Sequence, residues 1–260
     1  MSPATGTFTP APGAAPYLRM VRAQASMETR LLLRNGEQLL LAVVIPVLAL
    51  VGGVLGAERM GLDLAHRPVD VLTPGVLALA VMSTSFTSLA IATGFERRYG
   101  LLKRLGASPL PRSGLLLGKV GSLLIVQGLQ AVVICAVAFA LGWDPGGGVT
   151  GWLVALLGAL LGTLAFASLG LALAGTLRAE ATLAAANLVY LLLLTGGGVV
   201  VPRSTYGAAE APLALLPSGA LGDVLRNALL EGTVAGSALL VLIAWAAVGS
   251  VLAARLFRWE

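Results

Sequence analysis

Six long stretches without a charged side chain constrain the fold more than any other feature of the chain. None of them contains Asp, Glu, Lys, Arg or His, and they are 19 to 29 residues long. About 20 helical residues cross a hydrocarbon core that is about 30 Å thick. The stretches are continuously apolar, which argues against the alternating strands of a β-barrel. The sequence predicts an all-α membrane protein with six transmembrane helices, at residues 39–57, 71–94, 120–142, 149–177, 181–201 and 233–254.

Composition supports this class. Apolar residues make up 57% of the 260 residues and charged residues only 11%, whereas a soluble domain has about 25% charged residues. The charged residues form short islands between the apolar stretches. The net charge of +5 does not indicate a nucleic-acid partner, because the basic residues flank membrane spans and form no continuous stripe.

The distribution of Lys and Arg predicts the orientation of the chain. Six spans place both termini on one side of the membrane. That side carries 13 of the 17 basic residues, and the opposite side carries four. Cytoplasmic loops are enriched in Lys and Arg, so we expect a multi-pass protein of the cell membrane with both termini in the cytoplasm.

The chain ahead of the first span divides into two parts. Residues 1–16 contain four prolines and no charge, which is typical of a disordered tail. Residues 17–38 interleave arginines with apolar side chains, which favours an amphipathic helix at the membrane interface. The alternative is a solvated segment whose charges only set the topology. Residues 39–260 then form one six-span domain.

Residue patterns that support enzymatic chemistry or metal binding are missing from the sequence. His66 is the only histidine and Cys135 the only cysteine, which excludes the usual zinc ligand sets and an intrachain disulfide. The stretch from Gly114 to Lys119 resembles a phosphate loop, but it is one residue short between its glycines and lacks the Ser or Thr after the lysine. We therefore expect no catalytic site, no metal and no cofactor on this chain.

Neutral polar side chains are the only polarity predicted inside the bundle. Such groups join helices by hydrogen bonds or line a pathway. The candidates are Ser85, Gln127, Gln130, Asn187 and Tyr190. The pairs Gly52/Gly56 and Gly158/Gly162 have the spacing that allows close helix approach. A proton relay would need ionisable groups in the spans, so uphill transport would draw its energy from another subunit.

The loop after the second span has an ordered pattern. It carries six basic residues and one acid between residues 95 and 119. Wound as one helix, residues 95–105 place the aromatic and leucine side chains on one broad face and most of the basic side chains on the other. Gly106, Pro109 and Pro111 would end that helix. Such a helix fits against a partner protein, whereas a loop that only sets topology needs no such pattern.

The residues of this loop resemble a known family. The similarity lies in Glu96-Arg97-Arg98-Tyr99-Gly100-Leu101-Leu102-Lys103-Arg104-Leu105, followed by Ser108-Pro109 and Gly118-Lys119. This pattern is similar to the loop after the second span of type-2 ABC transporter permeases, the ABC-2 family, which includes bacterial drug and polysaccharide exporters. Arg98 stands where many members have an acid, and the two leucines after Gly100 replace a common Thr or Met. Residues 202–232 resemble the short outer re-entrant helices before the last span of that family.

The resemblance implies a partner and a mechanism. Two permease chains, identical or paralogous, would form the membrane pathway with two ABC ATPase subunits, which would carry the ATP and Mg²⁺. The loop would supply the coupling helix that contacts the ATPase. Its residues would be Phe95, Glu96, Arg97, Arg98, Tyr99, Gly100, Leu101, Leu102, Lys103, Arg104 and Leu105.

The implied activity is ATP-driven export. A hydrophobic drug-like or lipid-like substrate suits the neutral lining of the spans better than an ion. Two alternatives stay open: a structural or sensory membrane subunit without transport, and an integral membrane enzyme that modifies lipids. The second would be expected to show clustered Asp, His or Ser near the interface.

Overall fold

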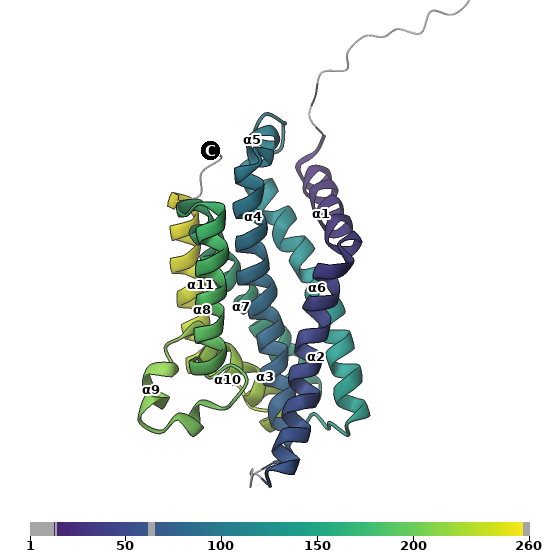
Figure 1. Cartoon of the computed structure of the whole chain (residues 1–260), viewed down its shortest axis with the longest axis vertical. Helices are drawn as coiled ribbons and strands as arrows, with labels where there is room; N and C mark the ends of the chain where they lie inside the picture. The colour runs from purple at the N-terminus through teal and green to yellow at the C-terminus, as the bar shows by residue number, and fades with distance from the viewer. Residues whose placement is uncertain (1–12, 14, 62–65, 257–260) are drawn as a thin grey trace, which may run out of the picture.

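The computed structural model describes residue 13, residues 15–61 and residues 66–256, and these residues form helices and no strand (Figure 1). Six of the helices are long and apolar enough to cross a membrane. The prediction of an all-α protein with six membrane-spanning helices is therefore confirmed. The expected disordered tail falls almost entirely outside the described residues.

The spans occur in simple order along the chain. They lie lengthwise along the molecule (Figure 1). They are α2 (Gly36–Arg59), the continuous helix formed by α3 (Pro68–Met82), η1 (Ser83–Ser88) and α4 (Leu89–Arg98), then α6 (Arg112–Ala140), α7 (Gly148–Thr176), α8 (Ala179–Gly196) and α11 (Gly236–Leu256).

The continuous helix α3–η1–α4 is the centre of the bundle. Of the residues in its apolar stretch, 78% are buried within the structure, whereas the share is 17% to 28% for α2, α6, α8 and α11. It starts three residues before the predicted span because Pro68 occupies the first turn, where a missing N–H costs nothing. It continues to Arg98 and ends where Gly100 adopts a left-handed conformation at φ 69°.

The third span is longer than predicted. Helix α6 starts at Arg112, just after Pro111, and not at residue 120. The sequence suggested a loop because charged residues occupy positions 112 and 119. The structure places Lys119 inside α6, where it is 1% exposed, and two carboxylates neutralise its charge.

Helix α1 (Tyr17–Arg34) precedes the first span and lies along α6. The two backbones approach closely: a Cβ atom added to Gly118 would lie 2.5 Å from Cγ of Gln24. Asn35 separates α1 from α2, so the predicted segment 17–38 ends earlier as a helix. The contact with α6 holds α1 against the bundle on one side.

Short helices fill the opposite end of the molecule. Helix α8 ends at Gly196, and not at residue 201, because Gly197 and Gly198 turn the chain, Gly198 at φ 66°. The chain then forms η2 (Arg203–Ala209), α9 (Glu210–Leu213), α10 (Pro217–Arg226) and η3 (Asn227–Glu231). Helix α10 packs against α3, α7 and α11. Short helices before the last span are thus present, and their depth in a membrane stays a prediction.

Two glycines of α7 allow α10 to pack closely against it. A Cβ atom at Gly158 would overlap Cγ1 of Val224, and one at Gly162 would come within 2.9 Å of Cδ1 of Leu221. The Gly158/Gly162 pair therefore serves close helix approach, toward α10. Gly52 and Gly56 have nothing within 4 Å and lie on an open face of α2.

We expect Gly158→Val to destabilise the protein by about 1–3 kcal/mol, because the new side chain overlaps Val224 in a filled contact. The measurement is the free energy of unfolding of the purified chain in detergent. Gly56→Val is the matched control, since it introduces the same side chain into open space. Equal stability of the two variants would contradict this account of the α7–α10 contact.

Candidate functional site

The candidate site lies at the end of the bundle where α4 meets α5 (Leu101–Gly106). We call this the basic end, because it carries Arg97, Arg98, Lys103 and Arg104. The structure corrects the prediction of one helix over residues 95–105: α4 ends at Arg98, and the left-handed Gly100 turns the chain before α5 begins. A helix interior cannot contain such a φ value, so the two faces predicted for one helix are divided between two.

Arg97 and Arg98 fasten the end of α4 to the α7–α8 connection. Arg97 donates to the carbonyl oxygens of Gly175 at 2.7 Å and Leu177 at 2.5 Å. Gly175 lies in the last turn of α7 and Leu177 directly follows the helix, so their carbonyls lack helical partners and a guanidinium stabilises them. Arg98 pairs with Glu180 in the first turn of α8. Both side chains were predicted to contact an ATPase, and the structure engages both within the chain.

Lys119 is the centre of a buried ion cluster that includes Glu96. Lys119 Nζ on α6 lies 2.7 Å and 2.9 Å from the two carboxylate oxygens of Glu96. The same ammonium lies 3.0 Å from Oε1 of Glu28 on α1. Gln24, one turn earlier on α1, donates to Glu28 at 2.7 Å. We call Glu28, Glu96 and Lys119 the charge cluster; it joins α1, α4 and α6.

Burial makes the charge cluster costly to disrupt. The side chain of Lys119 is 1% exposed, that of Glu28 14% and that of Glu96 21%. Removing one partner of a buried pair leaves an uncompensated charge, which costs about 3–5 kcal/mol. The sequence indicated Glu96 and Lys119 but not that they meet, and Glu28 gave no signal of its own.

The rest of the loop divides into a buried and an exposed part. Leu102 is fully buried and packs with Leu115 and Leu171. Tyr99 is 70% exposed and Leu101 37% exposed, while Lys103 and Arg104 also face outward. The Phe95 ring stacks on Tyr99 at 6.2 Å. The exposed side chains of the predicted coupling segment include Tyr99, Leu101, Lys103 and Arg104, and we call these four the α5 surface.

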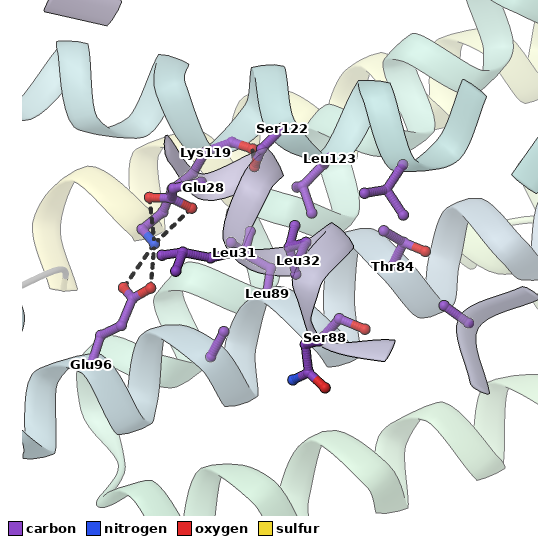
Figure 2. Close-up of a pocket in the computed structure, with 14 residues that line it drawn as sticks. Glu28, Leu31, Leu32, Thr84, Ser88, Leu89, Glu96, Lys119, Ser122 and Leu123 are labelled. Carbon is purple, nitrogen blue, oxygen red and sulfur yellow. Dashed lines mark hydrogen bonds and ion pairs between the residues drawn. The ribbon is translucent and has the colours of Figure 1, made fainter. Parts of the chain in front are cut away.

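A cavity of about 210 Å³ lies beside the charge cluster. Figure 2 shows Glu96, Glu28 and Lys119 at one end of it and Thr84 and Ser88 toward the other. The wall between the two ends is mainly apolar. Its apolar side chains on α1, α4 and α6 are Leu31, Leu32, Leu89, Ala92, Leu123 and Val126, and Asn35, Ala42 and Ser122 also line the cavity. The cavity thus has one charged end and an apolar body.

The polar residues predicted inside the bundle meet at η1, a π-helical turn. Gln127 of α6 donates to Oγ of Ser85 at 2.6 Å and accepts from Thr163 of α7 at 2.8 Å. Gln130 accepts from Thr84 at 2.9 Å and donates to the carbonyl of Ala42 on α2 at 2.7 Å. These bonds connect α2, η1, α6 and α7. The hydroxyl of Thr84 was an expected interior polar group of the second span, whereas Thr163 is a partner that the sequence alone did not single out.

Two further predicted polar residues lie on α8, and they differ. Tyr190 packs against the core with its hydroxyl near the side chain of Ser83 in η1. Asn187 is exposed on the outer face of α8, and no hydrogen bond from it is found within the described part of the chain. Asn187 therefore does not join helices within this chain, whereas Tyr190 does.

The opposite end has an ion network of its own. Arg203 lies 2.5 Å from Asp223, and Arg226 donates to the carbonyls of Gly198 and Val199. Burial raises the pKa of Asp223 in spite of the opposing arginines, and burial lowers the pKa of Arg226 to about 10. Arg226 stays protonated at neutral pH and fixes the turn after α8 upon α10.

The geometry defines a multi-pass membrane protein whose six spans carry no clustered metal ligands among the described residues. Its family follows from comparison with known proteins. The sequence model of the ABC-2 type transporter family matches residues 21–213, so the chain belongs to that family. It is the membrane-spanning, transporting part of an ABC transporter, and membership implies association with an ABC ATPase subunit. No curated protein matches the chain.

The two lysines of the chain allow a matched test of the charge cluster. We expect Lys119→Met to lower the free energy of unfolding by about 3 kcal/mol, because it leaves two carboxylates facing each other without a cation. Lys103→Met, on the exposed surface, should change it by less than about 0.5 kcal/mol. The measurement is equilibrium unfolding of the full chain in detergent.

Adding Glu28→Gln and Glu96→Gln to Lys119→Met should recover part of the lost stability, because the triple variant buries no net charge. A triple variant that is less stable than Lys119→Met alone would contradict the electrostatic explanation.

Proposed function

We propose that this chain is the permease subunit of an ATP-driven exporter, with its ATPase bound at the basic end. The observation that carries the proposal is the exposed α5 surface, on a helix that lies at the end of the bundle (Figure 1). The chain belongs to a transporter family, and its sequence contains no nucleotide-binding motif. The proposed cargo is a hydrophobic drug-like or lipid-like molecule, which suits spans that are apolar or neutral polar away from the charge cluster. ATP and Mg²⁺ would be bound by the ATPase.

The proposed coupling runs from α5 into the bundle. When two ATPase subunits close on ATP, they move as rigid bodies, and a contact at Tyr99 and Leu101 would move with them. The buried Leu102 anchors α5, and Arg97 and the charge cluster tie the adjacent end of α4 to α7, α6 and α1. The displacement would therefore pass to four helices together.

The proposed orientation places the basic end in the cytoplasm of the cell. The positive residues gather at this end, as cytoplasmic segments require. An ATPase that uses cellular ATP would also lie there. Both termini and the α5 surface would then face the cytoplasm, and α9 and α10 would face the outside.

A second permease chain completes the proposal. Among the six spans α8 is the least buried, since only 17% of the residues in its apolar stretch are buried within the chain. Asn187 is exposed near the middle of that helix. An amide in hydrocarbon without a partner is unfavourable, and in membranes such side chains join helices. We propose that α8 contributes to the contact between the two permease chains.

The docking proposal predicts that Tyr99→Ala combined with Leu101→Glu abolishes binding of the ATPase subunit and export, because both side chains lie on the exposed α5 surface. The measurements are co-purification of the ATPase, its ATP hydrolysis and substrate efflux. Thermal stability should not change. These positions test docking alone, whereas changes at Glu96 or Gly100 would also disturb the fold.

Leu215→Glu is the control for this variant, since Leu215 is 66% exposed at the opposite end. It should leave docking intact. Normal export by the Tyr99/Leu101 double variant, at normal protein levels, would rule out the α5 surface as the coupling site.

The subunit contact predicts that Asn187→Cys, in a Cys135→Ala background, forms a dimer with a short bifunctional maleimide in native membranes. Val248→Cys on α11, which replaces a residue that is 52% exposed, is the control and should not react in this way. Cross-linking is read by denaturing electrophoresis. A chain that is dimeric by size but gives no cross-linked product with the Asn187→Cys variant would place the contact elsewhere or indicate a paralogous partner.

A further inference from the structure

The charge cluster does not balance its own charge. With its groups ionised, two carboxylates face one ammonium, so the cluster carries one net negative charge. Among the described residues, no basic side chain besides Lys119 pairs with Glu28 or Glu96. The two arginines that follow Glu96 are directed elsewhere, Arg97 to α7 and Arg98 to Glu180. An unbalanced charge with little access to water is unfavourable.

The carboxylates retain acceptor capacity. Two ionised carboxylates offer about eight lone-pair positions. Lys119 has three protons and Gln24 contributes one hydrogen bond to Glu28. At least half of the acceptor positions therefore remain for further donors. Lys119 itself is 1% exposed and fully engaged, so an anionic group finds no free cation here.

The cavity beside the cluster offers space for the missing cation. Its volume of about 210 Å³ equals about seven water molecules at about 30 Å³ each. The carboxylates stand at one end (Figure 2), and the body is lined mainly by leucines, Ala92 and Val126, with Asn35, Ser122, Thr84 and Ser88 as its neutral polar residues. Water would not satisfy such a wall, whereas a hydrocarbon chain would. A metal ion is disfavoured, because only two carboxylates are present and Lys119 lies between them.

We propose that this cavity binds a cationic amphiphile, with an ammonium group at Glu28 and Glu96 and its hydrocarbon chain along Leu32, Leu89 and Leu123. The ammonium balances the cluster and donates to the free acceptor positions. The amine belongs either to an aminophospholipid head group or to a single-chain amine, and these share the same chemistry. The inference rests on the proposed function only in making this ligand the exported molecule. Binding itself requires neither ATP nor a partner.

The test uses the full chain in phosphatidylcholine nanodiscs at pH 7.5, with dodecylamine as the probe and dodecanol as its uncharged analogue. Dodecylamine should bind more tightly than dodecanol. Glu28→Gln should weaken dodecylamine binding about tenfold or more, because it removes a charge-assisted hydrogen bond and the net negative charge. Dodecanol binding should not change. Glu180→Gln is the control: it removes a carboxylate at the same end that pairs with Arg98 outside the cavity.

A second variant keeps the test valid if Glu28→Gln fails to fold. Leu32→Phe reduces the cavity without altering charge and should weaken binding of both probes. Native mass spectrometry from nanodiscs with equal phosphatidylethanolamine and phosphatidylcholine identifies the source. Selective retention of phosphatidylethanolamine by the wild type, lost in Glu28→Gln, supports a lipid head group, and dodecylamine binding alone supports a single-chain amine.

Equal affinity for dodecylamine and dodecanol, or dodecylamine binding that survives both Glu28→Gln and Leu32→Phe, would overturn the proposal. Binding that behaves as expected in a chain that exports no amine would instead refute the proposed transport role and leave the binding site standing. The two failures are thus distinguishable.

Discussion

The buried contact between Lys119 and the two carboxylates is the interaction on which the basic end depends. It joins α4 and α6 to α1, which is far from them in the sequence, and it allows a lysine to lie inside a helix that crosses the membrane. The charge also explains why the loop after the second span is short: α6 can begin at Arg112 because its one deeply placed cation is neutralised. Rigidity at this end follows, since Arg97 adds α7 to the same assembly.

The six spans could be predicted from the sequence, because uncharged length is a local property that needs no knowledge of packing. The helix ends could not, since they depend on contacts between distant residues. From the sequence alone, the charge of Lys119 indicated a loop. In the structure Lys119 lies within α6, because Glu28 and Glu96 pair with it there. Gly100 was treated as part of a helix, although its left-handed φ ends one. The matched family supports the ABC-2 resemblance that this loop suggested.

Interior polarity was predictable by residue type but not by pairing. Ser85 lies in η1, and Gln127, Gln130 and Tyr190 lie against it, whereas Asn187 faces outward on α8. The sequence of α8 does not show which of Tyr190 and Asn187 faces the bundle, because apolar residues lie on all sides of this helix. The use of Gly158 and Gly162 was likewise hidden: the spacing indicated a close contact, and the structure shows that the partner is the short α10 rather than another span. Burial and partners are properties of the assembled bundle.

The π-helical turn at Ser83–Ser88 determines how the two halves of the central helix are rotated relative to each other. One extra residue per turn shifts the phase of all that follows by about 100°. The faces of α3 and α4 are therefore set independently, although they form one helix, and Gly170 lets α7 pack directly against the turn, 2.9 Å from the Phe86 carbonyl to an added Cβ. A single-residue deletion here would leave each half helical but rotate Glu96 away from Lys119. The number of residues in this turn therefore determines the direction in which Glu96 points, and so whether it can pair with Lys119.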